Sequence, residues 1–331
     1  MPSLTCSDIS IGWVSLRLSN FSCNWELTGL PLAHNIMPDS ASTILSAAIT
    51  SRLSVLEAMV DSANSLVCEN KDMTIPTLSA TAADSEVTVN ISAYKFVTIH
   101  DVEALQHQLQ RECNKHELKG TVLVAIEGLN VFLAGSKARI EAFLTFLRSD
   151  TRFSDLTVKY SISQGQPFRK LRVRIKREII TMRRPLIQPE RCRAPAVAPE
   201  QLQTWLQRGQ DDEGRPVVMM DTRNAFEVDM GTFQNCIDYQ IAKFSEFPDI
   251  IEGKADEFKG KTVVTFCTGG IRCEKAAIVM QQAGFERVYQ LDGGILNYFE
   301  KVGGQHWNGA CFVFDEREGL NADLQPTRPG S

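Results

Sequence analysis

The fold of the C-terminal part of this 331-residue chain is indicated by residues 262–276, which read Thr-Val-Val-Thr-Phe-Cys-Thr-Gly-Gly-Ile-Arg-Cys-Glu-Lys-Ala. A short apolar strand over 262–266 delivers Cys267 to its carboxyl end, a loop with two glycines follows, and a helix is expected over 273–283. In open α/β sheets, ligands bind at the carboxyl edge of the strands. The stretch therefore predicts a site at the end of a buried strand.

The loop combines a nucleophile with sources of positive charge. Gly269 and Gly270 allow the backbone to curl so that successive N–H groups point at one centre. The start of the helix adds partial positive charge and Arg272 adds a full one, and both favour the thiolate form of Cys267. These residues are the predicted catalytic pair. The residues alone also allow a second interpretation, in which Cys267 is a small apolar residue buried at a strand end.

Short apolar strands and helices alternate around this stretch and predict a parallel α/β domain over 199–305. We expect a helix at 199–209 and further strands at 217–221 and 288–291. A proline-rich linker is expected over 185–198, because proline removes backbone donors and restricts the residue before it. Residues 306–331 are expected to be a C-terminal tail.

A separate α+β domain is predicted over 91–184, preceded by a weakly ordered extension at 1–90. The expected strands are 94–99, 120–126, 130–134, 156–161 and 171–180, and the expected helices are 101–117 and 136–147. A β-α-β-β-α-β order is that of a ferredoxin-like fold. The predicted fold class is α/β, with a ferredoxin-like α+β domain followed by an α/β domain with a parallel sheet.

Composition excludes several other classes of protein. The chain is 43% hydrophobic and 23% charged, which is ordinary for a globular protein and unlike collagen or a coiled coil. No stretch approaches the roughly 18 uncharged apolar residues that span a bilayer, so no membrane association is expected. The 9 cysteines are scattered without zinc spacing, so we expect a reducing compartment, the cytoplasm, and no metal. No flavin, nicotinamide or nucleotide motif is evident, so no bound cofactor is expected.

Charge divides the chain into a basic block between two acidic ones. Residues 91–194 carry 19 Lys and Arg against 10 Asp and Glu, whereas residues 195–331 carry 13 against 21. Within the basic block, a predicted strand alternates cations with Leu171, Val173 and Ile175, which period two places in the core. A cationic strand face suits an RNA backbone, although a merely solvated face is the alternative. The predicted RNA-binding residues are Arg169, Lys170, Arg172, Arg174, Lys176 and Arg177.

The motifs of the C-terminal domain resemble those of rhodanese (sulfurtransferase) domains. Residues 267–276 are similar to the rhodanese active-site loop, and the spacing of Asp221, Arg223 and Glu227 is similar to the Asp-x-Arg-x-x-x-Glu signature. Residues 288–295 resemble the final strand with its double-glycine turn. The resemblance implies that Cys267 carries a persulfide and that the active-site loop continues through Thr268, Gly269, Gly270, Ile271 and Cys273. We expect Asp221, Arg223 and Glu227 to form a network of ion pairs that orders the loop.

Further motifs extend the resemblance to one family of rhodanese-containing proteins. Residues 127–130 (Glu-Gly-Leu-Asn), 166–168 (Gln-Pro-Phe), 244–248 (Phe-Ser-Glu-Phe-Pro) and 309–315 (Gly-Ala-Cys-Phe-Val-Phe-Asp) are similar to those of the oxygen-dependent tRNA uridine hydroxylases. This resemblance covers about Ser92 to Leu324. It implies hydroxylation of the wobble uridine, position 34 of tRNA, at C5 to give 5-hydroxyuridine. It further implies the anticodon stem-loop as partner and molecular oxygen as co-substrate.

Several alternatives remain open at this stage. A sulfurtransferase that passes persulfide sulfur from Cys267 to a thiophilic acceptor is the main rival function, and the fused basic domain argues against it. In a hydroxylase, Cys267 acts either as a thiolate that adds to uracil C6 or as the persulfide. Cys273 is either a resolving thiol or a replacement for a helix-capping serine. No sulfur-donor or electron-donor protein is identified by the sequence.

Overall fold

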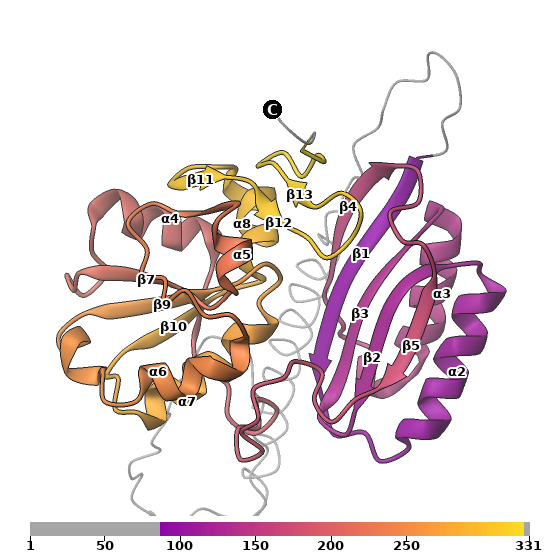
Figure 1. Cartoon of the computed structure of the whole chain (residues 1–331), viewed down its shortest axis with the longest axis horizontal. Helices are drawn as coiled ribbons and strands as arrows, with labels where there is room; N and C mark the ends of the chain where they lie inside the picture. The colour runs from indigo at the N-terminus through magenta and orange to yellow at the C-terminus, as the bar shows by residue number, and fades with distance from the viewer. Residues whose placement is uncertain (1–86, 328–331) are drawn as a thin grey trace, which may run out of the picture. The chain divides into compact units, whose positions relative to one another are not determined.

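The structure, a computed structural model, describes residues 87–327 (Figure 1). The extension expected at 1–90 lies outside the described residues, except for its last four. The described chain forms a ferredoxin-like domain and then an α/β domain, which confirms the predicted fold class. None of the helices between residues 87 and 327 has the length and apolar character required to cross a membrane.

The first domain is a five-stranded sheet with two helices on one face (Figure 1). Its strand order is β4-β1-β3-β2-β5. The first four strands give the antiparallel ferredoxin-like order, and β5 is added at the edge parallel to β2. The strands are β1 (Val87–Phe96), β2 (Lys119–Ala125), β3 (Gly128–Gly135), β4 (Val158–Gln164) and β5 (Leu171–Ile175), and the helices are α2 (Val102–Lys115) and α3 (Lys137–Ser149), with a short 3-10 helix at Thr151–Phe153.

Alternation along the strands gives this sheet two different faces. Odd-numbered residues of β1 and β3, such as Ile91 and Val131, are buried under the helices. Even-numbered residues, such as Ser92 and Asn130, lie on the opposite face, which is turned toward the second domain. On β5 the predicted core face is only partly correct. Val173 is buried, but Ile175 is 46% exposed because it ends an edge strand that has a single neighbouring strand.

The second domain is built on a parallel sheet with the strand order β6-β10-β9-β7. The strands predicted at 217–221, 262–266 and 288–291 are confirmed. The elements are β6 (Ala196–Val197), α4 (Pro199–Arg208), β7 (Val217–Asp221), α5 (Ala225–Val228), β8 (Gly231–Phe233), α6 (Phe247–Ile251), β9 (Thr262–Phe266), α7 (Ile271–Gln282), β10 (Val288–Leu291) and α8 (Gly294–Val302), with 3-10 helices at Phe244–Glu246 and Ala255–Phe258. Helix α7 begins two residues before the predicted start, directly at the end of the glycine loop.

The segment predicted as a C-terminal tail packs against both domains over its described part. Strand β11 (Trp307–Gly309) pairs with β8, and β12 (Cys311–Phe312) pairs with β13 (Gly319–Leu320). Between β12 and β13, the Arg317 guanidinium donates to Ser161 Oγ of β4 over 2.7 Å. The segment therefore extends from the second domain to the sheet of the first.

A buried lysine of α7 joins the two domains. Lys275 is 1% exposed, and its Nζ lies 2.8 Å from a carboxylate oxygen of Glu127 and 2.8 Å from one of Glu178. The same Nζ donates to the carbonyl oxygen of Ile180 over 3.0 Å. Glu127, which lies between β2 and β3, therefore holds the sheet against the helix that follows the glycine loop.

Candidate active site

The loop after β9 wraps the Cys267 sulfur in backbone N–H groups. Gly270 has a φ of +96°, a conformation that favours glycine, and its N–H donates to Cys267 Sγ with an N–S distance of 3.1 Å. A Cβ at Gly294 would lie 2.4 Å from the carbonyl oxygen of Cys267, so only glycine fits there. The double-glycine turn before α8 thus packs directly against the loop and sets its shape.

Cys267 is held as a thiolate. Burial of this side chain alone raises its pKa. A hydrogen bond from Cys273, the charge of Arg272 and the backbone N–H groups of Arg272 and Gly270 outweigh that effect and lower the pKa of Cys267 to about 5. The sulfur therefore carries negative charge at neutral pH, which makes it a nucleophile.

Arg272 is fixed by a buried carboxylate. Its two terminal nitrogens lie 2.6 and 2.7 Å from the two oxygens of Glu227, which is fully buried. Within residues 87–327, its Nε has no hydrogen-bond partner. A bidentate pair of this kind holds the planar guanidinium in one orientation. Arg272 therefore contributes charge near Cys267 from a fixed position.

A second buried ion pair, between Arg223 and Asp221, orders the chain around Glu227. Arg223 and Asp221 are buried, and Arg223 Nη2 lies 2.7 Å from an Asp221 oxygen. Arg223 also donates to the carbonyl oxygens of Glu227 and Gly231. These contacts order the segment that carries Glu227, as expected for a network that shapes the loop.

Cys273 lies in the first turn of α7, fully buried beside Cys267. Gly270 occupies the N-cap position, so Cys273 does not replace a capping residue. Its Sγ lies 3.8 Å from Thr222 Oγ1. Burial, then the hydrogen bond to Cys267 and the negative charge of that thiolate, raise the pKa of Cys273 well above its ordinary value. Cys273 therefore stays a neutral thiol that donates to its neighbour.

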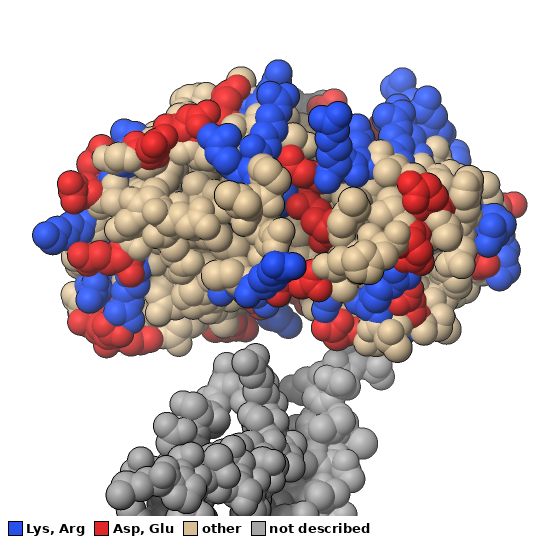
Figure 2. All heavy atoms as spheres, turned by 90° about the horizontal axis from the view of Figure 1, so that it is seen from below, with Lys and Arg blue, Asp and Glu red and all other residues tan. Residues whose placement is uncertain are grey.

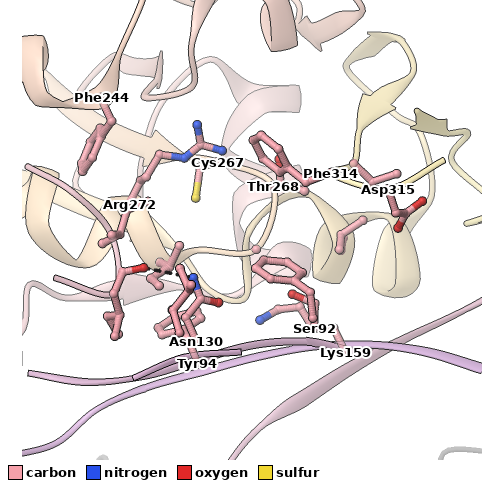
Figure 3. A pocket seen from close by; sticks show the side chains of 18 of the residues that line it. Ser92, Tyr94, Asn130, Lys159, Phe244, Cys267, Thr268, Arg272, Phe314 and Asp315 are labelled. Carbon is pink, nitrogen blue, oxygen red and sulfur yellow. Dashed lines mark hydrogen bonds between the residues drawn. The ribbon is translucent and has the colours of Figure 1, made fainter. Parts of the chain in front are cut away.

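A cleft of about 410 Å³ opens between the glycine loop and the polar face of the first sheet (Figure 3). Cys267, Thr268, Gly269, Ile271 and Arg272 line one wall. Gly270 and Cys273, the other predicted loop residues, are not among the residues that line the cleft. Residues of the first domain line the opposite wall: Asn90, Ser92, Tyr94, Asn130 and Lys159. The site is thus made by both domains.

The sheet side of the cleft holds candidate site residues that the sequence prediction missed. Tyr94 donates its hydroxyl to Glu274 over 3.2 Å, and burial raises the pKa of Tyr94 well above its ordinary value. Lys159 is 9% exposed and lies on the same wall. Lys159 stands between Val158 and Tyr160, so strand alternation places it on the other face of the sheet. The sequence does not indicate which part of the protein that face contacts. Tyr160 packs partly against the core and also lines the cleft, as does Phe168.

The predicted RNA-binding residues fall into three groups. Arg169, Lys170 and Arg172 line a shallower hollow of about 460 Å³, which shares Phe168, Phe314 and Asp315 with the cleft. Lys176 lines the cleft itself. Arg174 and Arg177 are exposed and line neither. In Figure 2, Lys and Arg side chains project from the upper edge of the view, mostly over its middle and right.

Comparison with known families agrees with this architecture. Residues 88–179 match the UPF0176 acylphosphatase-like domain, and residues 199–301 match the rhodanese-like domain. The second domain is therefore a rhodanese-like domain, with an activated cysteine in its loop, fused to an acylphosphatase-like one. A tRNA uridine(34) hydroxylase of Cupriavidus pinatubonensis is 60% identical over 73% of this chain and 86% of its own length. One of Thiobacillus denitrificans is 60% identical over 72% of this chain and 96% of its own length. This chain belongs to the tRNA uridine(34) hydroxylase family.

Proposed function

We propose that this protein hydroxylates uridine 34 of tRNA at C5, giving 5-hydroxyuridine, with molecular oxygen as co-substrate and Cys267 as the nucleophile. The names of the relatives at about 60% identity support the reaction. The observation that carries the proposal is the composition of the cleft. A thiolate with a pKa of about 5 forms part of one wall, and the polar face of a basic domain forms the other.

The cleft suits a single nucleotide whose base is no longer stacked on its neighbours in the RNA. Chemistry at C5 of uracil requires the base to be turned out of the anticodon loop into a pocket. Ser92, Asn130 and Thr268 line the cleft and offer hydrogen-bonding groups to a base. Phe168 and Phe314 line both hollows and provide apolar rings on which unpaired bases stack. The cleft therefore provides both polar and stacking contacts for a flipped uridine.

The second hollow gives the RNA backbone a path to the cleft. Arg169, Lys170 and Arg172 line it, and cations of this kind bind phosphates with release of counterions. Arg169 is paired with Glu316 at 2.7 Å, so its charge is partly neutralised without RNA. We place the anticodon stem-loop along this hollow, with uridine 34 entering the cleft. The reaction takes place in the cytoplasm, where the tRNA substrate is found.

Addition of a thiolate to C6 of uracil explains why the enzyme needs a reactive cysteine. The sulfur pair forms the S–C6 bond, and C5 becomes an enolate carbon that is able to react with oxygen. If the persulfide of Cys267 is the working form, no adduct of Cys267 with the base forms through Sγ itself. Mass spectrometry after incubation with tRNA that contains 5-fluorouridine at position 34 separates the two forms, because the fluorinated base retains the adduct.

Nucleoside mass spectrometry of tRNA tests the proposed function directly. Cells that lack the protein are grown with oxygen and complemented with wild type, Cys267→Ala or Cys192→Ala, the last a control at an exposed cysteine. We expect 5-hydroxyuridine to return with wild type and Cys192→Ala but not with Cys267→Ala. Return with Cys267→Ala would remove the cysteine from the mechanism. If only thiosulfate turnover or a thiolated nucleoside changes, the protein is a sulfurtransferase.

A further inference from the structure

Lys159 lies on the sheet wall of the cleft, on the other side from Cys267 (Figure 3). It belongs to β4, where it faces Ser92 of β1 in the strand register. Its neighbour Val158 is buried in the core and Tyr160 packs partly against it, so alternation turns Lys159 to the cleft, which it lines. The side chain is only 9% exposed.

No counter-ion is paired with the Lys159 ammonium group in the part of the chain that the structure describes. Among residues 87–327, no carboxylate forms an ion pair with its Nζ, and no hydrogen-bond acceptor lies within range. Its nearest aromatic contact is the Tyr94 ring, whose centroid is 5.4 Å from Nζ. Lys275, which is also buried, differs in this respect, because two glutamates and a carbonyl oxygen surround its Nζ. Among the described residues, the fold thus supplies ion-pair partners to Lys275 and none to Lys159.

A buried cation without a partner lowers the stability of the folded chain, because the charge loses its hydration. Desolvation accordingly lowers the pKa of Lys159, and the charges of Cys267, Asp292, Glu274 and Glu300 oppose that shift. A buried ammonium group of this kind in a cleft indicates that a bound ligand supplies its ion-pair or hydrogen-bond partner. The ligand must offer an oxygen with negative charge or with charge that develops during the reaction.

We propose that Lys159 binds O4 of the target uracil and stabilises the enolate that forms when Cys267 adds to C6, which makes it a catalytic residue. This inference rests on the proposed function. In that step, the thiolate pair becomes the S–C6 bond and the C5=C6 π pair becomes a C4=C5 bond. The carbonyl π pair moves onto O4, which takes up the negative charge lost by sulfur. No proton or oxidant takes part in this step.

Release of tritium from tRNA with [5-³H]uridine at position 34, measured without oxygen, reports this enolate alone. Protonation of C5 by water and reversal of the addition exchange the label. We expect wild type to release tritium and Lys159→Met to release it about 100-fold more slowly or worse, the effect of removing one oxyanion partner. Lys137→Met, on the solvent side of α3 and 60% exposed, is the matched control and should behave as wild type. Unchanged release by Lys159→Met would overturn the inference.

Two further measurements separate catalysis from folding. Lys159→Met should melt at the same or a higher temperature than wild type, because it removes an uncompensated charge, and it should bind tRNA within about twofold. A lower melting temperature with the loss of release would show a structural role instead. In Lys159→Ala, added butylamine should restore part of the release. Failure of the amine in a variant that remains folded would count against a charge contact.

The same assays distinguish failure of this inference from failure of the proposed function. If wild type forms 5-hydroxyuridine in oxygen but releases no tritium without it, the hydroxylase function stands and the role of Lys159 falls. If wild type neither forms 5-hydroxyuridine nor releases tritium, both fall.

Discussion

Arg272 acts on Cys267 through its charge, and the pair that it forms with Glu227 allows this effect to be measured separately from stability. Removing Arg272 alone leaves Glu227 buried and uncompensated, which typically costs about 3–5 kcal/mol. Replacing both residues with methionine removes the charge and the orphaned carboxylate together. Such replacements of a buried pair are often neutral for folding.

We therefore expect the double variant Arg272→Met/Glu227→Met to fold with near-native stability but with a less acidic Cys267. In wild type the thiolate is present above pH about 5 and is lost as the pH falls through that value. In the double variant the titration midpoint of Cys267 should rise toward that of an ordinary thiol, because the positive charge of Arg272 is gone. The rate of iodoacetamide labelling of Cys267 against pH, read by peptide mass spectrometry, measures the midpoint. An unchanged midpoint would mean that the Cys273 thiol and the backbone N–H groups hold the thiolate without Arg272.

At the scale of the element, β5 is a cationic edge strand whose end meets a hollow next to the cleft. Arg172 lies on the face opposite Val173 and lines that hollow, whereas Arg174 lines neither. The strand thus presents one arginine inside the proposed RNA path and one outside it. This difference makes the path testable within a single element.

Arg172→Ala should weaken tRNA binding and reduce the slope of log Kd against log salt by about one, the value for one lost phosphate contact. Arg174→Ala, on the same strand but outside the hollow, is the control and should leave the slope unchanged. Filter binding at several salt concentrations gives both slopes. Equal slopes for Arg172→Ala and wild type would place the RNA backbone elsewhere on the molecule.

At the scale of the whole molecule, the cleft beside Cys267 is lined by both domains and therefore depends on their contact. Lys275 is buried between them, with Glu127 and Glu178 on the side of the first domain. The loop with Cys267 precedes the same helix, so a change in the docking of α7 moves one wall of the cleft relative to the other.

Lys275→Met should uncouple the domains. It removes both ion pairs and leaves two carboxylates near the interface, so we expect a loss of about 3–5 kcal/mol and unfolding in two separate transitions. Scanning calorimetry detects the second transition, and hydroxylation should fall with it. Lys259→Met, which removes an exposed lysine of the second domain, is the control. A single transition at the wild-type temperature would show that other contacts hold the domains together.

The sequence by itself determined the parts of this protein that depend on neighbouring residues. The strands at 217–221, 262–266 and 288–291 follow from short apolar runs between turn residues, and the thiolate loop follows from Cys267, its glycines and the start of α7. Two-residue alternation also predicted the burial of Val173. The same alternation wrongly predicted that Ile175 is buried, because it does not indicate where the end of an edge strand is no longer covered by other residues.

Only the tertiary structure decided which of these parts meet. Lys275 and Glu127 are 148 positions apart, and their contact depends on how one domain docks on the other. The same docking places Lys159 and Tyr94 across a cleft from Cys267, although nothing near them in the chain indicates a nucleophile. Local patterns specify which side of a strand a residue occupies. Packing between domains decides what that side faces, and in this protein it faces the reactive sulfur.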